Sequence, residues 1–335
     1  MFGPAIIQER DELLVVLPSN TASVLRSGAM AWGTGDIPDL AGTTALVTGS
    51  NTGIGLETAA ALAMAGAHTV LACRNVDKAE VARAEIEGRG ARGEIEILKL
   101  DLASQSQIAD AAAEALERFP RIDRLVNNAG VMADRRLETE EGHELLFGTN
   151  HLGHFAFTGL ILPAILAAPS SRIVTVTSLS QKVGRLRWHD LHLVDGYRPL
   201  VAYAQSKLAN ITFAVALQKR LAGAAADTGS LVAHPGFAAT DILRGHHRQP
   251  SQLEHRLAAR FVQTPADASR PSLRAATDPS AYGGEFYGPS RFEVHGPPVP
   301  VRPSRRALDE EEQERLWDVS VEHTGVEYPL TEPFG

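Results

Sequence analysis

The stretch TALVTGSNTGIG, from Thr44 to Gly55, decides the fold of this chain. It begins with a short apolar run typical of a buried strand, and the periodic segment Leu56 to Ala65 predicts a helix directly after it. Glycines at such a junction let the backbone approach a pyrophosphate, and the first turn of the helix offers it unpaired amide donors. The glycine spacing, Gly-x3-Gly-x-Gly, departs from the usual dinucleotide fingerprint, and a tight structural turn is the alternative reading.

Short apolar runs alternate with segments of helical length along most of the chain. This rhythm is typical of βαβ units, and it predicts an α/β fold: a doubly wound Rossmann fold with a mostly parallel seven-stranded sheet flanked by helices. The expected strands are Thr44 to Val47, Thr69 to Cys73, Ile95 to Leu100, Arg124 to Asn127, Ile173 to Thr177, Leu231 to Ala233 and Gly284 to Tyr287. The expected helices are Leu56 to Ala65, Lys78 to Glu87, Gln105 to Arg118, Glu140 to Ala167, Val201 to Leu221, Pro265 to Thr277 and Ala307 to His323.

The pattern divides the chain into three parts. Residues 1–40 are expected to be an N-terminal extension, dispensable to about residue 29 because Met30 offers an alternative start. Residues 41–290 are expected to form the Rossmann domain, with a substrate lid at about 241–264. Residues 291–335, which begin with a Pro-rich stretch, are expected to form a C-terminal appendage with a terminal helix.

Composition excludes several classes of protein. The chain has 335 residues, of which 44% are hydrophobic and 21% charged, as in ordinary globular proteins. A net charge of -8 with dispersed basic residues argues against a nucleic-acid partner. The single cysteine, Cys73, excludes an intrachain disulfide and fits a reducing, cytoplasmic location. Apolar runs fall short of the about 18 residues that a membrane span needs, so no span is expected.

Several polar residues stand at predicted strand ends, where a doubly wound sheet binds its ligand. Cys73 occupies the position where an acidic residue would bind the adenosine ribose, and Arg74 follows it. A guanidinium group suits a 2′-phosphate, which favours NADP(H) over NAD(H), although Arg74 could simply be a solvated strand-end residue. Asp101 could accept a hydrogen bond from the adenine or cap the next helix. Ser178 ends the fifth strand, as a site residue or a helix cap.

Tyr203 and Lys207 lie one turn apart in a predicted helix, so both side chains share one face. A neighbouring cation stabilises a phenolate and lowers the pKa of the phenol, which makes Tyr203 a candidate proton-transfer group. Such a pair can also cover a solvated face without any chemistry.

With these pieces in order, the chain resembles the short-chain dehydrogenase/reductase family, and within it the branch around the retinol dehydrogenases. The resemblance spans about residues 36–243 and continues towards the C-terminus. It rests on the Thr48 to Gly55 loop, Asp101, Asn127 to Gly130, Asn150, Ser178, Tyr203, Lys207, Pro235, Gly236 and Thr240.

The resemblance implies a role for each residue. Ser178 would hold the substrate oxygen, Tyr203 would be the acid/base, and Lys207 would bind the nicotinamide ribose and lower the pKa of Tyr203. Asn150 would anchor a water that relays protons to Lys207. The implied cofactor-binding residues are Gly49, Ser50, Asn51, Thr52, Gly53, Ile54, Gly55, Arg74, Asp101, Leu102, Asn128, Ala129, Gly130, Tyr203, Lys207, Pro235, Gly236 and Thr240.

The expected function is therefore NADP(H)-dependent interconversion of a hydrophobic ketone or aldehyde with its alcohol. Two alternatives stay open: reduction of a conjugated C=C bond in a natural product, and a non-catalytic NADP(H)-binding sensor or interaction module. The insertion Gln181 to Leu200 would be a wall of the substrate pocket or a surface excursion. The helices at 140–167 and 201–221 could form the contact of a homodimer, as is common in the family.

Histidines cluster at two places in the sequence, His189 with His192 and His246 with His247. Neither pair has further ligands at informative spacing, so no metal site is predicted. His154 is expected to be packed or hydrogen-bonded rather than catalytic.

Overall fold

The structure, a computed structural model, describes residues 31–237 and 263–330. The chain divides into two units, Met1–Ala31 and Trp32–Gly335, and all described residues except Ala31 belong to the second. Four predictions fall outside the described residues: the dispensable extension to about residue 29, nearly all of the lid, the role of Thr240, and the absence of a metal at His246 and His247. The domain boundaries likewise stay predictions.

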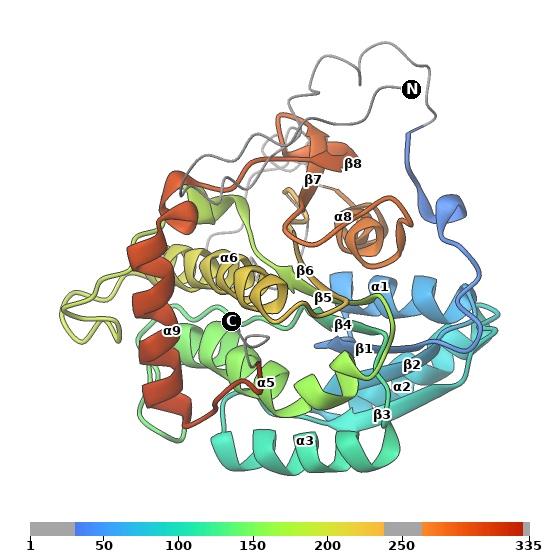
Figure 1. Cartoon of the computed structure of the whole chain (residues 1–335), viewed down its shortest axis with the longest axis horizontal. Helices are drawn as coiled ribbons and strands as arrows, with labels where there is room; N and C mark the ends of the chain where they lie inside the picture. The colour runs from blue at the N-terminus through green and yellow to red at the C-terminus, as the bar shows by residue number, and fades with distance from the viewer. Residues whose placement is uncertain (1–30, 238–262, 331–335) are drawn as a thin grey trace, which may run out of the picture. The chain divides into compact units, whose positions relative to one another are not determined.

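The second unit is built on one sheet, and its fold is the predicted α/β Rossmann type (Figure 1). In the described residues the sheet has eight strands in the order β3-β2-β1-β4-β5-β6-β7-β8. All neighbours are parallel except β7 and β8. The strands are β1 (Thr44–Thr48), β2 (His68–Cys73), β3 (Ile95–Lys99), β4 (Arg124–Asn127), β5 (Ser171–Val176), β6 (Thr228–Ala233), β7 (Phe286–Arg291) and β8 (His295–Pro300).

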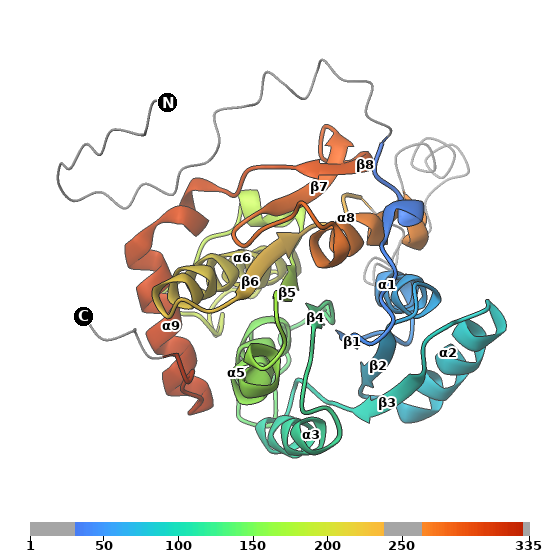
Figure 2. The ribbon, with the colours of Figure 1, turned by 45° about the vertical axis from the view of Figure 1, so that its right-hand side comes forward.

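Helices cover both faces of the sheet (Figure 2). One face packs against α1 (Gly53–Met64), α2 (Val76–Gly88) and α8 (Pro265–Thr277). The other packs against α3 (Gln105–Arg118), α5 (Gly153–Leu166) and α6 (Pro199–Gly223). The remaining helical segments are η1 (Thr34–Asp36), α4 (Leu145–Phe147), η2 (Gly148–Leu152), η3 (Leu179–Lys182), η5 (Arg305–Leu308) and α9 (Glu310–Thr324).

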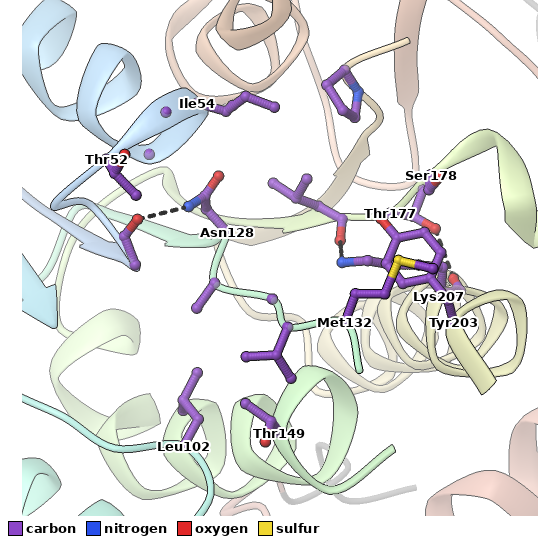
Figure 3. A pocket seen from close by; sticks show the side chains of 18 of the residues that line it. Thr52, Ile54, Leu102, Asn128, Met132, Thr149, Thr177, Ser178, Tyr203 and Lys207 are labelled. Atoms are coloured by element: carbon purple, nitrogen blue, oxygen red, sulfur yellow. Dashed lines mark hydrogen bonds between the residues drawn. The ribbon is translucent and has the colours of Figure 1, made fainter. Parts of the chain in front are cut away.

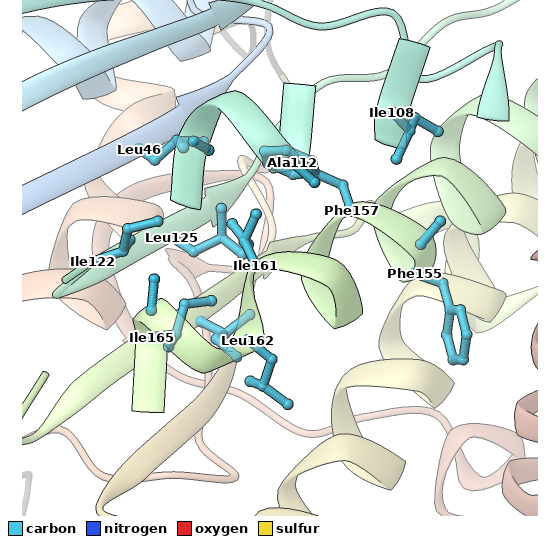
Figure 4. Packing of buried hydrophobic residues seen from close by; sticks show 14 of the residues in the cluster. Leu46, Ile108, Ala112, Ile122, Leu125, Phe155, Phe157, Ile161, Leu162 and Ile165 are labelled. Carbon is cyan, nitrogen blue, oxygen red and sulfur yellow. The ribbon is translucent and has the colours of Figure 1, made fainter. Parts of the chain in front are cut away.

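The core between the sheet and α3 and α5 explains why the strands are continuous apolar runs. Leu46 of β1 and Leu125 of β4 are fully buried, as are Ile108 of α3 and Ile161 of α5 (Figure 4). Since helices cover both faces of the sheet, most side chains on both faces of these strands are apolar.

The eighth strand is a difference from the expected seven. Residues 295–300 lie in the Pro-rich stretch that the sequence analysis reads as an appendage, yet they pair antiparallel with β7. Proline cannot donate to a ladder, but an edge strand needs partners on one side only, so Pro297, Pro298 and Pro300 are tolerated there.

The helix expected over 140–167 is interrupted. Glu144 caps the short α4, where its carboxylate accepts the Leu146 and Phe147 amides at 2.9 and 2.8 Å. A π turn, η2, follows before α5 begins, and Asn150 lies in it. Such π turns often occur at functional sites.

Helix α6 is the one described helix long and apolar enough to cross a membrane by length and composition. Within the fold, 78% of that apolar window is buried. Its apolar character is therefore accounted for by packing on both the sheet and neighbouring helices.

The C-terminal segment covers α5 and α6. The Tyr328 hydroxyl donates to the Phe155 carbonyl at 2.7 Å, and Arg220 of α6 lies 3.9 Å from the Trp317 ring centroid. A Cβ on Gly159 of α5 would lie 2.7 Å from Tyr328, so glycine is needed for this contact. The homodimer remains a prediction, but part of the helix surface on which it rests is already occupied within one chain.

Candidate active site

A cavity of about 640 Å³ opens at the carboxyl ends of the parallel strands, where the fold class predicts a ligand. Thr52, Ile54 and Asn128 lie at one end of it, and Ser178, Tyr203 and Lys207 lie together at the other (Figure 3).

The glycine-rich loop between β1 and α1 is shaped for close approach. Gly49 and Gly53 have φ of 65° and 59°, the left-handed region that favours glycine. A Cβ on Gly55 would lie 2.3 Å from the Gly49 carbonyl oxygen and 2.5 Å from Asn128 Nδ2. In the described structure, the N-cap Thr52 makes no side-chain hydrogen bond to the first turn of α1. This loop therefore fits a pyrophosphate, which would accept hydrogen bonds from the unpaired backbone amides in the first turn of α1.

Thr48 and Asn128 fasten this loop to the end of β4. Thr48 Oγ1 accepts the amides of Asn128 and Ala129, both at 2.9 Å. Asn128 Nδ2 returns a hydrogen bond of 2.8 Å to the Thr48 carbonyl. The strand ends that border the ligand thus hold each other in place.

His154 extends the network to Asn150. Its Nδ1 lies 2.9 Å from the Asn150 carbonyl oxygen, and its Nε2 lies 2.9 Å from Thr48 Oγ1. Burial lowers the pKa of His154 to about 4, so the ring is neutral. Because Nδ1 must donate to the carbonyl, Nε2 accepts the Thr48 hydroxyl. His154 is hydrogen-bonded within the frame, in line with the sequence analysis.

Ser50, a predicted cofactor-binding residue, does not line the cavity. Its side chain is buried, with Oγ 2.9 Å from the Val47 carbonyl oxygen and 3.4 Å from Cys73 Sγ. Cys73, at the position that decides the cofactor in the sequence analysis, is also buried. Both side chains support the loop from beneath.

The adenosine end of the cavity carries two cations, Arg74 and Lys78. Arg74 is exposed, and its Nε lies 3.9 Å from Asp101 Oδ2. Asp101 Oδ1 accepts the Ala103 amide at 3.0 Å, so the carboxylate does cap a turn. Sequence reasoning missed Lys78. Its position was a usable signal, since it comes four residues after Arg74 and begins the predicted helix.

At the other end, Ser178 and Tyr203 share a side-chain hydrogen bond. Burial raises the pKa of Tyr203, and the hydrogen bond to Ser178 opposes this without cancelling it. The sequence analysis predicts a pKa lowered by Lys207; in the structure burial outweighs any such effect. The phenol is therefore protonated at neutral pH.

Lys207 is buried beside this pair. Its Nζ donates to the Val176 carbonyl at 3.2 Å and lies 5.8 Å from the Tyr203 ring centroid. Burial lowers the pKa of Lys207 to about 8, because the charged form loses its hydration. The ammonium is still mostly charged at neutral pH.

Asn150 is buried and does not line the cavity. Its Oδ1 accepts the Val131 amide at 2.7 Å, and its Nδ2 donates to the Val131 carbonyl and to Ser206 Oγ, both at 3.1 Å. A Cβ on Gly130 would lie 3.4 Å from Lys207 Nζ. Asn150 thus fixes the loop after β4 against α6, and the implied water relay stays a prediction.

The other predicted residues do line the cavity: Gly49, Asn51, Thr52, Gly53, Ile54, Gly55, Arg74, Asp101, Leu102, Asn128, Ala129, Gly130, Pro235 and Gly236. Lining residues that sequence reasoning missed are Ala72, Asn75, Lys78, Leu100, Val131, Met132, Thr149, Val176, Thr177, Leu179, Ser180 and Phe237. Most of these are apolar and carry no motif.

The insertion Gln181 to Leu200 is mainly packed on the fold. Leu193 is fully buried, and Gln205 of α6 donates to the Leu191 carbonyl at 2.7 Å. Leu200 is its one residue on the cavity wall among those described. The insertion therefore contributes an edge of the pocket.

A glycine-rich βα loop joined to a Ser–Tyr–Lys group in one cavity defines a nicotinamide-dependent oxidoreductase site. Known proteins agree. The family model described as short chain dehydrogenase matches residues 43–250. The chain is 37% identical to human retinol dehydrogenase 13 over 295 residues, 86% of each chain.

Solved structures give the same result. An uncharacterized protein from Mycobacterium paratuberculosis is 36% identical, with a TM-score of 0.75, over 90% of this chain and all of that one. RhlG of Pseudomonas aeruginosa, in an active-site complex with NADP, is 25% identical with a TM-score of 0.60, over 74% of this chain and 94% of that one. The chain belongs to the short-chain dehydrogenase/reductase family of oxidoreductases and is similar to its retinol dehydrogenases.

Proposed function

We propose that this chain is an NADP(H)-dependent oxidoreductase that interconverts a hydrophobic ketone or aldehyde with the corresponding alcohol. The observation that carries the proposal is the group of Ser178, Tyr203 and Lys207 at the end of the cavity opposite the glycine-rich loop. A carbonyl oxygen placed between the two hydroxyls would accept a hydrogen bond from each.

Tyr203 is the acid/base. Its pKa is raised by burial, so it holds a proton at neutral pH and can donate it to the substrate oxygen during reduction. When bound, the nicotinamide supplies or accepts the hydride. Ser178, hydrogen-bonded to Tyr203, orients both the phenol and the substrate oxygen.

Lys207 supplies positive charge next to this step. With its pKa near 8, it is cationic at neutral pH while buried among groups that do not neutralise it. It would hold the ribose hydroxyls and favour the phenolate that forms when Tyr203 gives up its proton.

The preference for NADP(H) rests on charge at the adenosine end. Arg74 and Lys78 both line the cavity there, whereas the nearby carboxylate of Asp101 is engaged by the Ala103 amide. Two cations favour a 2′-phosphate, and the similarity to RhlG in complex with NADP supports the same choice.

The substrate class rests on the apolar side chains near Tyr203. Met132, Leu179, Leu200 and Phe237 line this part of the cavity, and Leu200 and Phe237 are partly exposed at 67% and 46%. Such a surface favours a hydrophobic carbonyl compound. We also propose a cytoplasmic location, which a single reduced cysteine fits.

The test is a panel of hydrophobic ketones, aldehydes and alcohols, read by nicotinamide absorbance with NADPH and NADH and their oxidised forms. We expect carbonyl reduction with a higher kcat/KM for NADPH. Binding of NADPH without turnover of any compound would contradict the proposal and favour a sensor. A product with an intact carbonyl and a saturated C=C bond would favour the alternative reaction.

A further inference from the structure

Three histidines from distant parts of the chain meet away from the catalytic cavity. They are His143 in the turn before α4, His192 in the insertion, and His323 in the last turn of α9. One nitrogen from each lies within 4.8 Å of the others. No metal site is predicted from the sequence because the pair His189 and His192 has no further ligand at informative spacing. His143 and His323 lie far from His192 in the sequence, and the fold alone brings the three together.

The separation of the rings suits a tetrahedral ion. Ring centroids lie 5.1 Å apart for His143 and His192, 4.8 Å for His143 and His323, and 5.2 Å for His192 and His323. Three imidazoles bound tetrahedrally at metal–nitrogen distances of about 2.0–2.1 Å have centroids about 5 Å apart. The rings therefore need to turn towards a common point rather than move together.

His143 provides an independent indication of a ligand. Its side chain is only 8% exposed, and its Nε2 is buried with no hydrogen-bond partner among the described residues. A buried polar atom without a partner is costly, and an ion bound at this point would satisfy it.

His192 is partly buried, and one of its ring nitrogens belongs to the same group of three. Its Nδ1 accepts the Glu144 amide at 3.2 Å, at the long end of the hydrogen-bond range. Binding a metal would exchange this one neutral contact for a metal–imidazole bond, which is much the stronger.

The surrounding charges are balanced. Glu141 and Asp190 act on the cluster as negative charges, and Arg136 as a positive one. Arg136 is itself paired with Glu138 at 2.6 Å. The local field therefore does not exclude a cation.

The other cluster of potential ligands in the described residues lacks these properties. It consists of His68, Glu94 and Glu96. Glu96 already pairs with His68 and with Arg118, which satisfies its carboxylate.

We propose that His143, His192 and His323 bind a divalent transition-metal ion of the Zn²⁺ class, with solvent as the fourth ligand. The site would tie the end of α9 to the insertion beside the catalytic helix α6. At the other end of α9, Trp188 of the insertion already donates to Glu312 at 3.0 Å. The ion would complete the second of two attachments between these segments, and its role would be structural.

The test uses the full chain without a polyhistidine tag, treated with EDTA and then dialysed against Zn²⁺. We expect one Zn²⁺ per chain and a rise in melting temperature on binding. His192→Gln and His323→Gln should each weaken Zn²⁺ binding by more than the about 10–100-fold that loss of an outer-shell partner costs a metal site. His189→Gln, an exposed histidine of the same insertion, is the matched control and should bind as the unchanged protein does.

Folding of each variant is checked in EDTA by circular dichroism. If a variant does not fold, Co²⁺ substitution in the unchanged protein decides: intense visible d–d bands of a four-coordinate ion support the site. The proposal is wrong if no stoichiometric Zn²⁺ binds, if binding survives His192→Gln and His323→Gln, or if Co²⁺ gives only weak octahedral bands.

Discussion

The two ends of the cavity are built on opposite principles. At the glycine-rich loop, Thr48 and Asn128 hydrogen-bond to each other and to the neighbouring backbone. At the catalytic end, Lys207 is buried and Tyr203 is partly buried. Their partners are the Val176 carbonyl and the Ser178 hydroxyl, and burial displaces both pKa values. The polar groups that hold the glycine-rich loop are therefore satisfied within the protein, whereas the side chains at the catalytic end can still hydrogen-bond a ligand.

Replacing Tyr203 at the catalytic end should have the largest effect on activity. Tyr203→Phe removes the proton donor, and general acid catalysis contributes about 10²–10⁴-fold to a rate. We expect kcat to fall by at least that factor while NADPH affinity, measured by fluorescence titration, stays nearly unchanged.

Tyr197→Phe is the matched control for this change. Tyr197 lies in the insertion and does not line the cavity, and its hydroxyl donates to the Ala133 carbonyl at 3.2 Å. Retained activity in Tyr203→Phe, or an equal loss in Tyr197→Phe, would remove Tyr203 from its role.

A substitution in the glycine-rich loop should reduce both folding stability and cofactor affinity. In Gly55→Ala the new methyl group would collide with the Gly49 carbonyl and Asn128 Nδ2, so we expect a loss of about 2–4 kcal/mol of unfolding free energy and a sharply weakened affinity for NADPH. Urea denaturation and NADPH titration measure the two effects.

Gly88→Ala provides the comparison, since a Cβ there meets nothing within 4 Å. It should be neutral or slightly stabilising, because alanine is the better helix residue. If Gly55→Ala and Gly88→Ala have the same stability and NADPH affinity, the glycine-rich loop is not as rigid as its contacts imply.

Lys207→Met should separate function from stability. The pKa of Lys207 is about 8 in the folded chain, against about 10.4 in an unfolded one, so burying the charge costs about 3 kcal/mol. The variant should lose activity yet unfold at higher urea concentration below pH 8.

The sign of the pH dependence provides the check. The cost of the buried charge is full below the folded pKa of about 8 and disappears above the unfolded pKa of about 10.4. The stability advantage of Lys207→Met should therefore shrink as the pH rises through that window. An advantage that grows with pH would show that Lys207 is not destabilised by burial.

The smallest effect should come from the exposed rim. Arg74→Ala removes one of two cations at the adenosine end, and we expect KM for NADPH to rise about tenfold, worth about 1.4 kcal/mol, with KM for NADH little changed. Arg83→Ala, which removes a surface partner of Glu80 on the same helix, should change neither constant.

Much of the fold could be predicted because strand and helix periods are local. The segments 105–118 and 265–277 have the bounds expected from the sequence. The site followed from strand ends and helical spacing, as for Tyr203 and Lys207. These signals depend on neighbours in sequence.

The features that were missed depend on neighbours in space. The π turn around Asn150 has no composition of its own, and β8 is hidden because its prolines are permitted by an edge position that the sequence does not reveal. The histidine cluster joins three segments whose approach is set by the packing of α9. The pKa of Tyr203 is another such feature. The sequence predicts that Lys207 in the next turn lowers it, whereas in the structure burial raises it.

The packing of the C-terminal segment has a consequence for synthesis of the chain. Trp317, Val326 and Tyr328 complete the apolar layer over α5 and α6, and they are translated well after both helices. A nascent chain can assemble β1 to β4 early, but the outer side of α5 stays uncovered until this segment has been translated. Nonsense mutations between α6 and this segment should therefore produce chains that chaperones retain.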